Sequence, residues 1–371
     1  MIDIGHGGPG SQAGLELPAP VVVLEALSRF IPPTTIRSVL TGTGRHSRRI
    51  RRLPAEAVVW LVIAIGIWTE CDIPSIWRQV AGTLRSLLLF LEGERPPSKA
   101  ALSQSRSRLG PSALRQVFVA TAAPIARHRT RGAFYKRMRL LAMDGARFEM
   151  PDTPANGAAF GRPSTRRDGQ TVQGGYPQCH AILLTETGTH VVLEAYIKRG
   201  RRSEFSAGIA LLRKVPPGCL VLQDRGFYGY RPLAEATRRG VQVLGRVASH
   251  VRFDRIETLR DGSYLAAIYP SSKRHRRHTD RLVVRVIEYT LDEPNRTGHG
   301  ERHRLVTTLL NAHQYPAREL AVLYHDRWEI ELGIDEIKTH QLRRHVHLRS
   351  RTPRGVLQEL YGIQRRALLD A

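Results

Sequence analysis

The sequence contains few cysteines. Its three, Cys71, Cys179 and Cys219, lie far apart among 371 residues, and none belongs to a Cys-x-x-Cys pair. Structural zinc sites use closely spaced cysteine pairs, and disulfides persist mainly in oxidising compartments. The cysteine content therefore argues against a zinc site and favours a reducing compartment.

Long apolar runs are missing as well. The longest, Ala57 to Trp68, is too short for a helix that spans a bilayer, which needs about 20 apolar residues. The first residues lack a basic start followed by an apolar core, so we expect no secretory signal. No basic amphipathic helix stands out either, so a membrane surface is a poor candidate for a partner.

Acidic residues are too few to balance the basic ones. The chain has 57 Lys and Arg against 33 Asp and Glu, which gives a formal net charge of +24. Such a surplus opposes compaction and attracts polyanions from a distance, so nucleic acid is the leading partner. At 371 residues the chain is long enough to bury a full core and to form more than one average domain.

The amino-terminal third has a helical pattern. Residues 1–18 are rich in Gly and Pro and predict a flexible terminus, and residues 19–130 predict a small all-helical domain. Pro20 to Phe30 predicts the first helix. Val58 to Trp68, apolar around most of its circumference, predicts the core helix of this domain. The residues expected to face inward on the first helix are Val22, Leu24, Leu27 and Phe30.

Two segments of this domain are candidates for DNA contact. The basic run Arg45 to Arg52 is either an arm that contacts phosphates or a solvated linker. Ser98 is the expected N-cap of a helix that ends near Leu109. That helix either enters a major groove or is an ordinary exposed helix. Its polar residues include Lys99, Gln104, Ser105, Arg106 and Arg108.

From Arg139 onward the pattern changes to strands. A short apolar run ends at Asp144-Gly145, and a second run ends at Asp224. Three antiparallel strands, followed by alternating helices and strands, predict an α/β fold with a mixed sheet, because crossover helices connect parallel strands. The expected strands are 140–145, 179–185, 189–197, 220–224 and 241–247, with helices at 203–213 and 232–239.

Residues 249–311 predict a β-rich insertion. Strands are expected at 265–269, 281–289 and 303–308. The basic hexamer 273–278 lies between the first two of these strands. It is either a tip that touches DNA or a disordered loop.

A polar stripe is expected on the helix that begins at Pro316. Its members fall within roughly 40° of one line on an α-helix, because three or four residues separate neighbours. Apolar residues flank the stripe, so it borders a buried surface. A carboxylate between an Arg and a Lys there suits a metal ligand beside a phosphate backbone, and a solvated helix with ion pairs is the alternative. The stripe consists of Tyr324, Arg327, Glu331, Asp335 and Lys338.

Three acids therefore stand in comparable places. Asp144 and Asp224 close apolar strands, and Glu331 lies on a helix expected to face the sheet. Strand ends in an open α/β sheet point into a crevice, so the three carboxylates would converge. Packed carboxylates repel one another unless divalent cations lie between them, as in two-metal phosphoryl transfer. Oxygen ligands favour Mg²⁺ or Mn²⁺ over zinc. Alternatively, Asp144 belongs to a plain turn and Asp224 caps the next helix.

With these residues the chain resembles the bacterial DDE transposases of the insertion-sequence-four family. Asp144-Gly145, followed by Pro151-Asp152-Thr153, resembles the segment around the family's first Asp. Val221 to Tyr228 resembles the segment around its second Asp, and the likeness extends over roughly residues 20–357. The family signature Tyr-x2-Arg-x3-Glu-x6-Lys is met by Tyr324, Arg327, Glu331 and Lys338.

The resemblance implies an RNase H-like catalytic domain formed by residues 137–248 and 312–362, interrupted by the β-rich insertion 249–311 and preceded by a helical DNA-binding domain. It implies cleavage and strand transfer at the inverted ends of an insertion sequence, through a hairpin intermediate. A homodimer on double-stranded DNA, in the bacterial cytoplasm at the nucleoid, is expected. The implied metal ligands for Mg²⁺, or Mn²⁺, are Asp144, Asp224 and Glu331, and the implied phosphate contacts are Tyr324, Arg327, Lys338 and Arg225. Several members of the family also stack a flipped base on an aromatic side chain of the insertion, for which Tyr264, Tyr269 and Tyr289 are the alternatives.

The carboxyl-terminal residues depart from the family pattern. After Gly362 the family continues into an apolar helix and a longer tail, whereas residues 363–371 differ, which a slipped reading frame or a decayed element would explain. We therefore expect an atypical, truncated terminus there. A catalytically inactive DNA-binding remnant, which occupies element ends or inhibits transposition, is the alternative function, and a stand-alone nuclease is a third.

Overall fold

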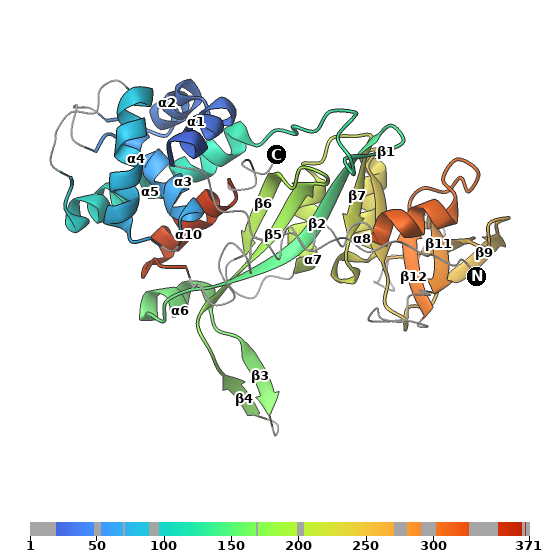
Figure 1. Ribbon diagram of the computed structural model, residues 1–371. Coiled ribbons are helices and arrows are strands. Elements are labelled where there is room, and N and C mark those ends of the chain that lie inside the picture. Colours follow the sequence, from blue (N-terminus) through green and yellow to red (C-terminus); the bar gives the residue numbers. More distant parts are fainter. Residues whose placement is uncertain are drawn as a thin grey trace.

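The computed structural model describes residues 20–47, 53–69, 71–88, 96–167, 170–198, 204–270, 280–290, 302–325, 348–365 and 368. Within these ranges an amino-terminal group of helices lies beside a large mixed sheet (Figure 1). The predicted fold class, α/β preceded by a helical region, is confirmed. No helix of the described ranges is long and apolar enough to cross a membrane.

The amino-terminal region is built around one fully apolar helix. Residues 57–67, within α3, are all buried, which confirms the predicted core helix. On α1 the expectation for Val22 is wrong: its side chain is 55% exposed, and Val23 is buried instead. Helix α2 was not predicted. The helices of this region are α1 (Pro20–Phe30), α2 (Pro33–Gly42), α3 (Ala55–Ile67), α4 (Ile73–Leu88) and α5 (Lys99–Thr121).

The predicted cap and end of the helix after Ser98 are confirmed. The Ser98 hydroxyl accepts a hydrogen bond from the Ala101 amide at 3.2 Å, and Gly110, with φ of 71°, divides α5 into two helical segments. The hypothesis that the first segment enters a DNA groove is wrong for two of its polar residues, which are not available for contact with DNA. Ser105 and Arg106 are only 3% and 8% exposed, because that face packs inside the protein.

A helix from the far end of the chain packs against this region. Helix α10 (Pro353–Ile363) lies beside α3 and α5, as Figure 1 shows. It crosses α3 at a pair of glycines, Gly66 and Gly362, where the two backbones are in direct contact. A side chain on either glycine would overlap backbone atoms of the other helix. The crossing therefore depends on the absence of a Cβ atom at both positions.

The sheet has the strand order of an RNase H-like fold. Its first five strands lie in the order β6-β5-β2-β7-β8. Strands β5 and β6 are antiparallel to their neighbours, whereas β7 is parallel to β2 and β8 is parallel to β7. Helices α7 and α8 make the crossovers, as predicted. The bounds are β2 (Met138–Glu149), β5 (Gln178–Glu186), β6 (Val192–Lys198), α7 (Glu204–Leu212), β7 (Cys219–Gln223), α8 (Tyr230–Arg238) and β8 (Gln242–Arg246).

The β-rich insertion continues this sheet. Strand β12 pairs antiparallel with β8, and β11, β10 and β9 follow in order. Within the described residues these nine strands and the short β1 (Phe134–Tyr135), which pairs with β2, form one ten-stranded sheet. The three predicted strands of the insertion are confirmed, and β9 was not predicted. The bounds are β9 (Asp254–Thr258), β10 (Tyr264–Ile268), β11 (Leu282–Thr290) and β12 (Arg302–Thr307).

Different helices cover the two faces of the sheet. Leu141 and Val221 pack with α7 and α8 on one face. On the other face, Ala142 packs with the amino-terminal helices, and Leu222 packs with a helix described over residues 317–325. We call this second element helix 317–325. It lies over the half of the sheet that contains β7, β8, β11 and β12.

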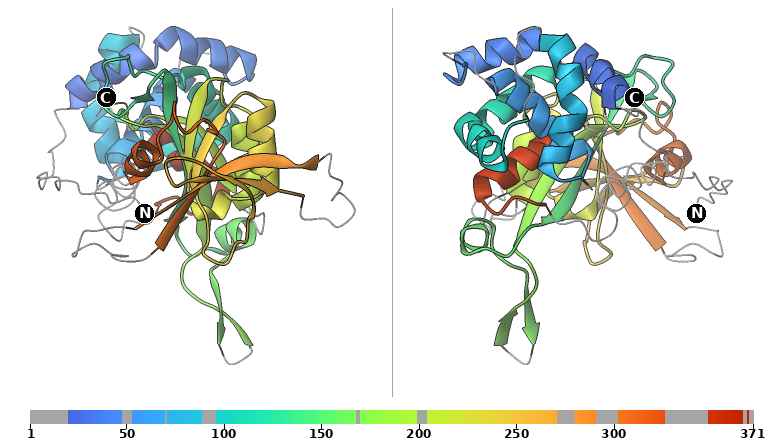
Figure 2. Two further views of the ribbon diagram at one scale, coloured as in Figure 1. Left: turned by 90° about the vertical axis from the view of Figure 1, so that its right-hand side faces the viewer. Right: turned by 60° about the vertical axis from the view of Figure 1, so that its left-hand side comes forward.

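A two-stranded ribbon projects from the sheet. Among the described strands, β3 (Ser164–Arg167) and β4 (Gln170–Gln173) pair only with each other. Figures 1 and 2 show this pair directed away from the rest of the molecule. Helix α6 (Pro154–Phe160) precedes the ribbon, and the short β1 (Phe134–Tyr135) pairs with β2. None of these elements was predicted from the sequence.

Candidate functional site

Two of the three predicted metal ligands occupy adjacent positions on neighbouring strands. Strands β2 and β7 are parallel, and their pairing ends with Met143 opposite Gln223. Asp144 and Asp224 are the next residues of the two strands. Each is half-buried. The structure therefore brings these two aspartates together at the carboxyl end of the parallel pair.

The prediction that a strand ends at Asp144 is wrong. Strand β2 continues to Glu149, because β5 pairs with it from Leu141 to Glu149 and holds it extended. Only the pairing with β7 stops beside Asp144. Asp144 is therefore fixed within a strand, and it does not belong to a plain turn. Its Oδ1 atom accepts a hydrogen bond from the Gly145 amide at 2.7 Å.

Both aspartates lie on the face of the sheet that helix 317–325 covers, as the alternation of side chains along β2 and β7 indicates. Leu140, Leu220 and Leu222 pack in the core beneath that helix. Side chains two residues apart share a face of a strand, so Asp144 and Asp224 belong to the same face. Asp224 precedes a short 3-10 helix (Arg225–Phe227) but makes no capping hydrogen bond to it. Capping therefore does not explain this carboxylate.

Helix 317–325 passes next to this pair. Its Tyr324 is only 6% exposed, and the Tyr324 hydroxyl donates a hydrogen bond of 3.3 Å to the carbonyl of Gln223, the residue before Asp224. The remaining signature residues, Arg327, Glu331 and Lys338, lie outside the described residues. The convergence of Glu331 with the two aspartates therefore remains a prediction.

Arg225 directly follows Asp224, and Tyr228 lies at the end of the short 3-10 helix. Arg225 is exposed, so its guanidinium is accessible to a polyanion. Burial raises the pKa of Tyr228 to about 12, although the nearby Arg304 acts in the opposite direction. The Tyr228 ring packs edge-on against Phe253, with ring centroids 6.1 Å apart. This contact joins the turn after Asp224 to the start of the insertion.

A further carboxylate at this end of the sheet was missed by the sequence analysis. Glu204, the first residue of α7, has its Oε1 atom 3.6 Å from Nδ1 of His180 on β5. Its carboxylate also lies beside Gly145, which follows Asp144, and beside Gly226, two residues after Asp224. Acids are common in the first turn of a helix, so nothing in the sequence distinguishes Glu204. Among the described residues, no group of three or more Asp, Glu, His or Cys side chains could hold a metal ion.

A hollow lined by basic and aromatic residues lies where the insertion begins. Its volume is about 620 Å³. Arg304 donates hydrogen bonds to the carbonyls of Val251 and Ala248, at 2.9 and 2.8 Å, and the Arg255 guanidinium lies 4.0 Å from the ring centroid of Tyr264. No local sequence pattern indicates this site, because its arginines are scattered along the chain. The lining consists of Ser249, His250, Val251, Arg252, Phe253, Arg255, Tyr264 and Arg304.

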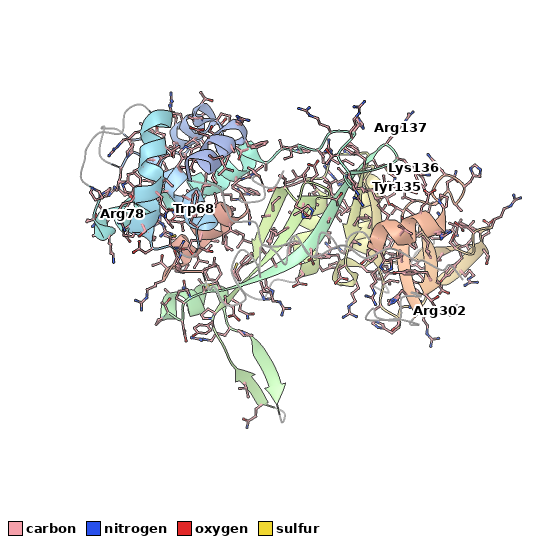
Figure 3. The ribbon with its side chains drawn as sticks, viewed as in Figure 1. Trp68, Arg78, Tyr135, Lys136, Arg137 and Arg302 are labelled. Atoms are coloured by element: carbon pink, nitrogen blue, oxygen red, sulfur yellow. The ribbon has the colours of Figure 1, made fainter. Side chains whose placement is uncertain are left out.

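The basic segments suggested by the sequence are only partly described. Residues 48–52 and the hexamer 273–278 lie outside the described ranges, and Arg45 donates a hydrogen bond to the carbonyl of Arg108 at 2.9 Å. Other exposed basic side chains occur both on the amino-terminal helices and on the sheet (Figure 3). Examples are Arg78 on α4, Arg137 between β1 and β2, and Arg302 on β12.

Comparison with known proteins identifies the class. The family model for the transposase DDE domain matches residues 135–368, and the model for the insertion element 4 transposase N-terminal region matches residues 21–119. The chain is 30% identical over 352 residues to transposase InsG for insertion sequence element IS4 of Escherichia coli (strain K12), a match that covers 92% of this chain and 74% of that protein. It is 27% identical over 219 residues to the putative transposase InsZ of the same organism, covering 58% of this chain and 68% of that protein.

A DDE catalytic domain that follows an insertion element 4 amino-terminal region defines the protein: the chain belongs to the IS4 family of DDE transposases, and its function is DNA transposition. The predicted family and function are confirmed. Domains of this class cleave DNA and depend on divalent metal. In a search of solved structures, the cryo-EM structure of a piggyBac transposase synaptic complex with hairpin DNA matches with a TM-score of 0.42 and 11% identity, over 96% of this chain and 76% of that chain.

Proposed function

We propose that this transposase cleaves and joins DNA at the inverted ends of its insertion sequence by two-metal phosphoryl transfer, with Asp144, Asp224 and Glu331 as the metal ligands. The observation that carries the proposal is the register of β2 and β7. It makes Asp144 and Asp224 neighbours on the face crossed by helix 317–325. Carboxylate oxygens suit Mg²⁺, or Mn²⁺, and two such ions would serve in-line attack at phosphorus.

The protein's own residues would orient the phosphodiester. Bound divalent ions would supply activation of the attacking hydroxyl and stabilisation of the leaving 3′ oxygen. The exposed Arg225, next to Asp224, would neutralise a phosphate oxygen. Arg327 and Lys338 are assigned the same task from the family signature. For Tyr324, burial and the hydrogen bond to Gln223 support packing of the helix on the sheet as an additional role.

Different parts of the chain would recognise the DNA ends and catalyse the reaction. We assign end recognition to the helical region 19–130, and chemistry to residues 137–248 together with 312–362. The insertion, 249–311, would provide further DNA contact through the arginine-lined hollow. Two copies would act together on paired ends at the nucleoid, as expected for an enzyme that joins two DNA ends.

The direct test is cleavage of DNA by the purified chain. The substrate is a duplex that carries the inverted end of the element, identified from the DNA that flanks the gene. We expect cutting at the element boundary in Mg²⁺ or Mn²⁺ and none in a chelator. Binding to ends without cutting would favour the inactive remnant. Cutting without any need for paired ends would favour a stand-alone nuclease.

End binding should weaken steeply as the salt concentration rises. A protein that neutralises phosphates releases condensed cations from DNA, and roughly six to ten contacts reduce affinity by about 1,000-fold or more between 50 and 200 mM salt. Because the formal charge is +24, we expect a large number of phosphate contacts. Fluorescence anisotropy across this range measures the slope. An affinity that is independent of salt would contradict the role assigned to the basic surplus.

A further inference from the structure

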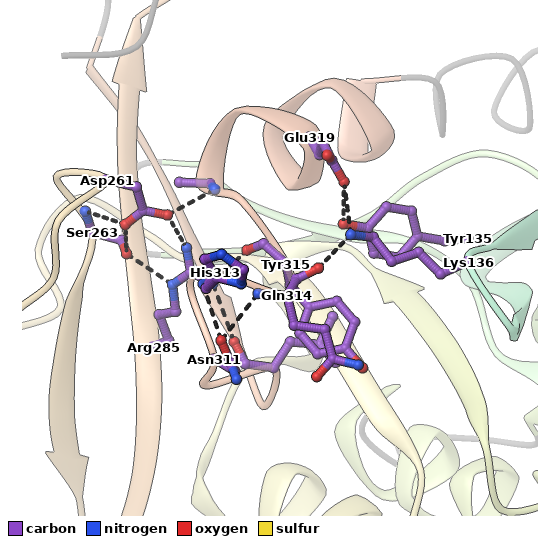
Figure 4. Close-up of polar contacts among 12 residues, drawn as sticks. Tyr135, Lys136, Asp261, Ser263, Arg285, Asn311, His313, Gln314, Tyr315 and Glu319 are labelled. Atoms are coloured by element: carbon purple, nitrogen blue, oxygen red, sulfur yellow. Dashed lines mark hydrogen bonds and ion pairs between the residues drawn. The ribbon is translucent and has the colours of Figure 1, made fainter.

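The insertion contains a buried arginine that holds the start of helix 317–325. Arg285 on β11 is fully buried. Its Nε atom donates to the Ser263 hydroxyl at 2.8 Å, and one terminal nitrogen donates to the Tyr315 carbonyl at 2.7 Å. The other terminal nitrogen forms an ion pair with Asp261 (Figure 4). One guanidinium therefore joins the turn before β10 to the loop that enters helix 317–325.

Asp261 completes the connection, because it also caps the helix. Its Oδ2 atom accepts a hydrogen bond of 2.9 Å from the amide of Ala317, the first residue of helix 317–325. Its Oδ1 atom accepts from the amide and the hydroxyl of Ser263. The first amides of a helix have no partner within the helix, and a carboxylate is favoured there by the helix dipole. A turn of the insertion thus supplies the cap that the helix lacks in its own sequence.

The carboxylate is held in its charged form. Burial would raise the pKa of Asp261, but the hydrogen bonds from Ser263 and Ala317 and the charge of Arg285 hold the pKa below its usual range. Burial lowers the pKa of Arg285, and Asp261 opposes that effect. A charged, partly buried pair with satisfied hydrogen bonds has a defined geometry. It is therefore suited to fix the direction of a helix.

A second group of contacts at this helix is more exposed. Tyr135 donates a hydrogen bond of 2.8 Å to Glu319, and Lys136 lies 3.3 Å from the same carboxylate (Figure 4). The side chains of Lys136 and Glu319 are 39% and 49% exposed. Solvent screens such a pair and weakens it. The Arg285–Asp261 pair, in which the arginine is fully buried, is accordingly the stronger anchor of the two.

Helix 317–325 is thus held at both described ends. Asp261 holds Ala317, and at the other end Tyr324 contacts the carbonyl next to Asp224. In the sequence, Glu331 follows residue 325 by six positions. A metal ligand has to be placed within about 0.5 Å of its productive position, and the elements that carry it have to be rigid.

We propose that Asp261 and Arg285 are positioning residues of the transposition reaction: through the cap on Ala317, the insertion sets the direction of helix 317–325, and Glu331 follows this helix six residues later in the sequence. The inference rests on the proposed function, since it takes Glu331 as a metal ligand. Its physical basis is that a displacement of about 1 Å in an active site can cost 100-fold in rate. The insertion then has a role in assembling the catalytic site in addition to any contact with DNA.

Two variants test the pair directly. Asp261→Ala removes the cap and the ion pair, and Arg285→Lys keeps the charge but loses the planar fork. For Asp261→Ala we expect end cleavage to fall about 10- to 100-fold and the Mg²⁺ concentration for half-maximal cleavage to rise severalfold, with end binding within about twofold of wild type. Arg285→Lys should give the same pattern with a smaller change.

A matched control separates positioning from general stability. Val284 precedes Arg285 on β11, is fully buried, and packs on the opposite face of the sheet from helix 317–325. Val284→Ala should lower the unfolding temperature but leave the Mg²⁺ requirement of the remaining activity at the wild-type value. A Mg²⁺ requirement that shifts equally in Val284→Ala and Asp261→Ala would overturn the positioning role.

Hydrogen exchange of the amides of residues 317–325 keeps this inference distinct from the proposed function. In the Asp261→Ala variant these amides should exchange at least about tenfold faster than in wild type. In the Val284→Ala variant their exchange rates should not increase in this way. Unchanged exchange in Asp261→Ala would overturn the positioning role whatever happens to cleavage. A wild-type protein that does not cut DNA, while Asp261→Ala still frees the helix, would overturn the proposed function alone.

Discussion

Replacement of Asp224 by Asn is expected to reduce cleavage at the element end by roughly 1,000-fold or more, which corresponds to about 4 kcal/mol of lost transition-state stabilisation. Asparagine keeps the shape of the side chain but removes the negative charge that would hold a divalent ion. Asp144→Asn should have an effect of the same size, because Asp144 and Asp224 occupy adjacent positions after the last paired residues of β2 and β7. Single-turnover cleavage of a labelled end measures the rate.

Binding and a neighbouring acid provide the controls for this prediction. Both asparagine variants should bind end DNA at least as well as wild type, because each removes negative charge from a surface that meets phosphates. Glu204 lies at the same end of the sheet but is not a proposed ligand, so Glu204→Gln should reduce cleavage by less than about tenfold. The double variant of Asp144 and Asp224 should be little worse than either single one. An Asp224→Asn protein that cuts within tenfold of wild type would contradict the metal-site proposal.

Replacement of Gly66 or Gly362 by Ala is expected to destabilise the helical region by at least about 3 kcal/mol. A Cβ atom on Gly362 would lie 2.5 Å from the carbonyl oxygen of Val62, and one on Gly66 would overlap the backbone of Gly362. Both obstacles are backbone atoms of helices, so the strain cannot be relieved by rotating a side chain. Helix α10 would have to move away from α3. Thermal or denaturant unfolding measures the loss.

Gly82 provides the matched control. It lies inside α4, and no atom lies within 4 Å of the position that a Cβ atom would occupy. Gly82→Ala should therefore stabilise the protein by about 0.5–1 kcal/mol, because alanine loses less conformational freedom in a helix than glycine does. If Gly66→Ala and Gly82→Ala shifted the unfolding temperature equally, the close crossing of α3 and α10 would not exist in solution.

Elements with a strong local signal were predictable. The uninterrupted apolar run of α3 has no polar face, so it had to be a buried helix. Ser98 was recognised as a helix cap because its hydroxyl follows Pro-Pro and precedes a helical pattern. The strands that bear Asp144 and precede Asp224 were predictable because each contains a short apolar run followed by an acid, although β2 continues past Asp144 to Glu149.

Elements that depend on distant partners were not predictable. The side chains of β9 are all exposed, so the strand has no apolar alternation and is held by its pairing with β10. Ser105 and Arg106 have the composition of an exposed helix face, yet Arg106 forms an ion pair with Glu359 of α10 at 3.5 Å. No local pattern contains a partner that lies more than 200 residues away.

The sequence by itself determined the class of this protein: the order of apolar runs, the surplus of positive charge, and the acids and signature residues are all readable along the chain. Only the tertiary structure decided which residues meet. Parallel pairing of β2 with β7 places Asp144 beside Asp224, and the turn at Asp261 caps a helix that begins 56 residues later. Local spacing fixes the shape of a helix or a strand, but contacts between distant segments depend on how complete surfaces pack together.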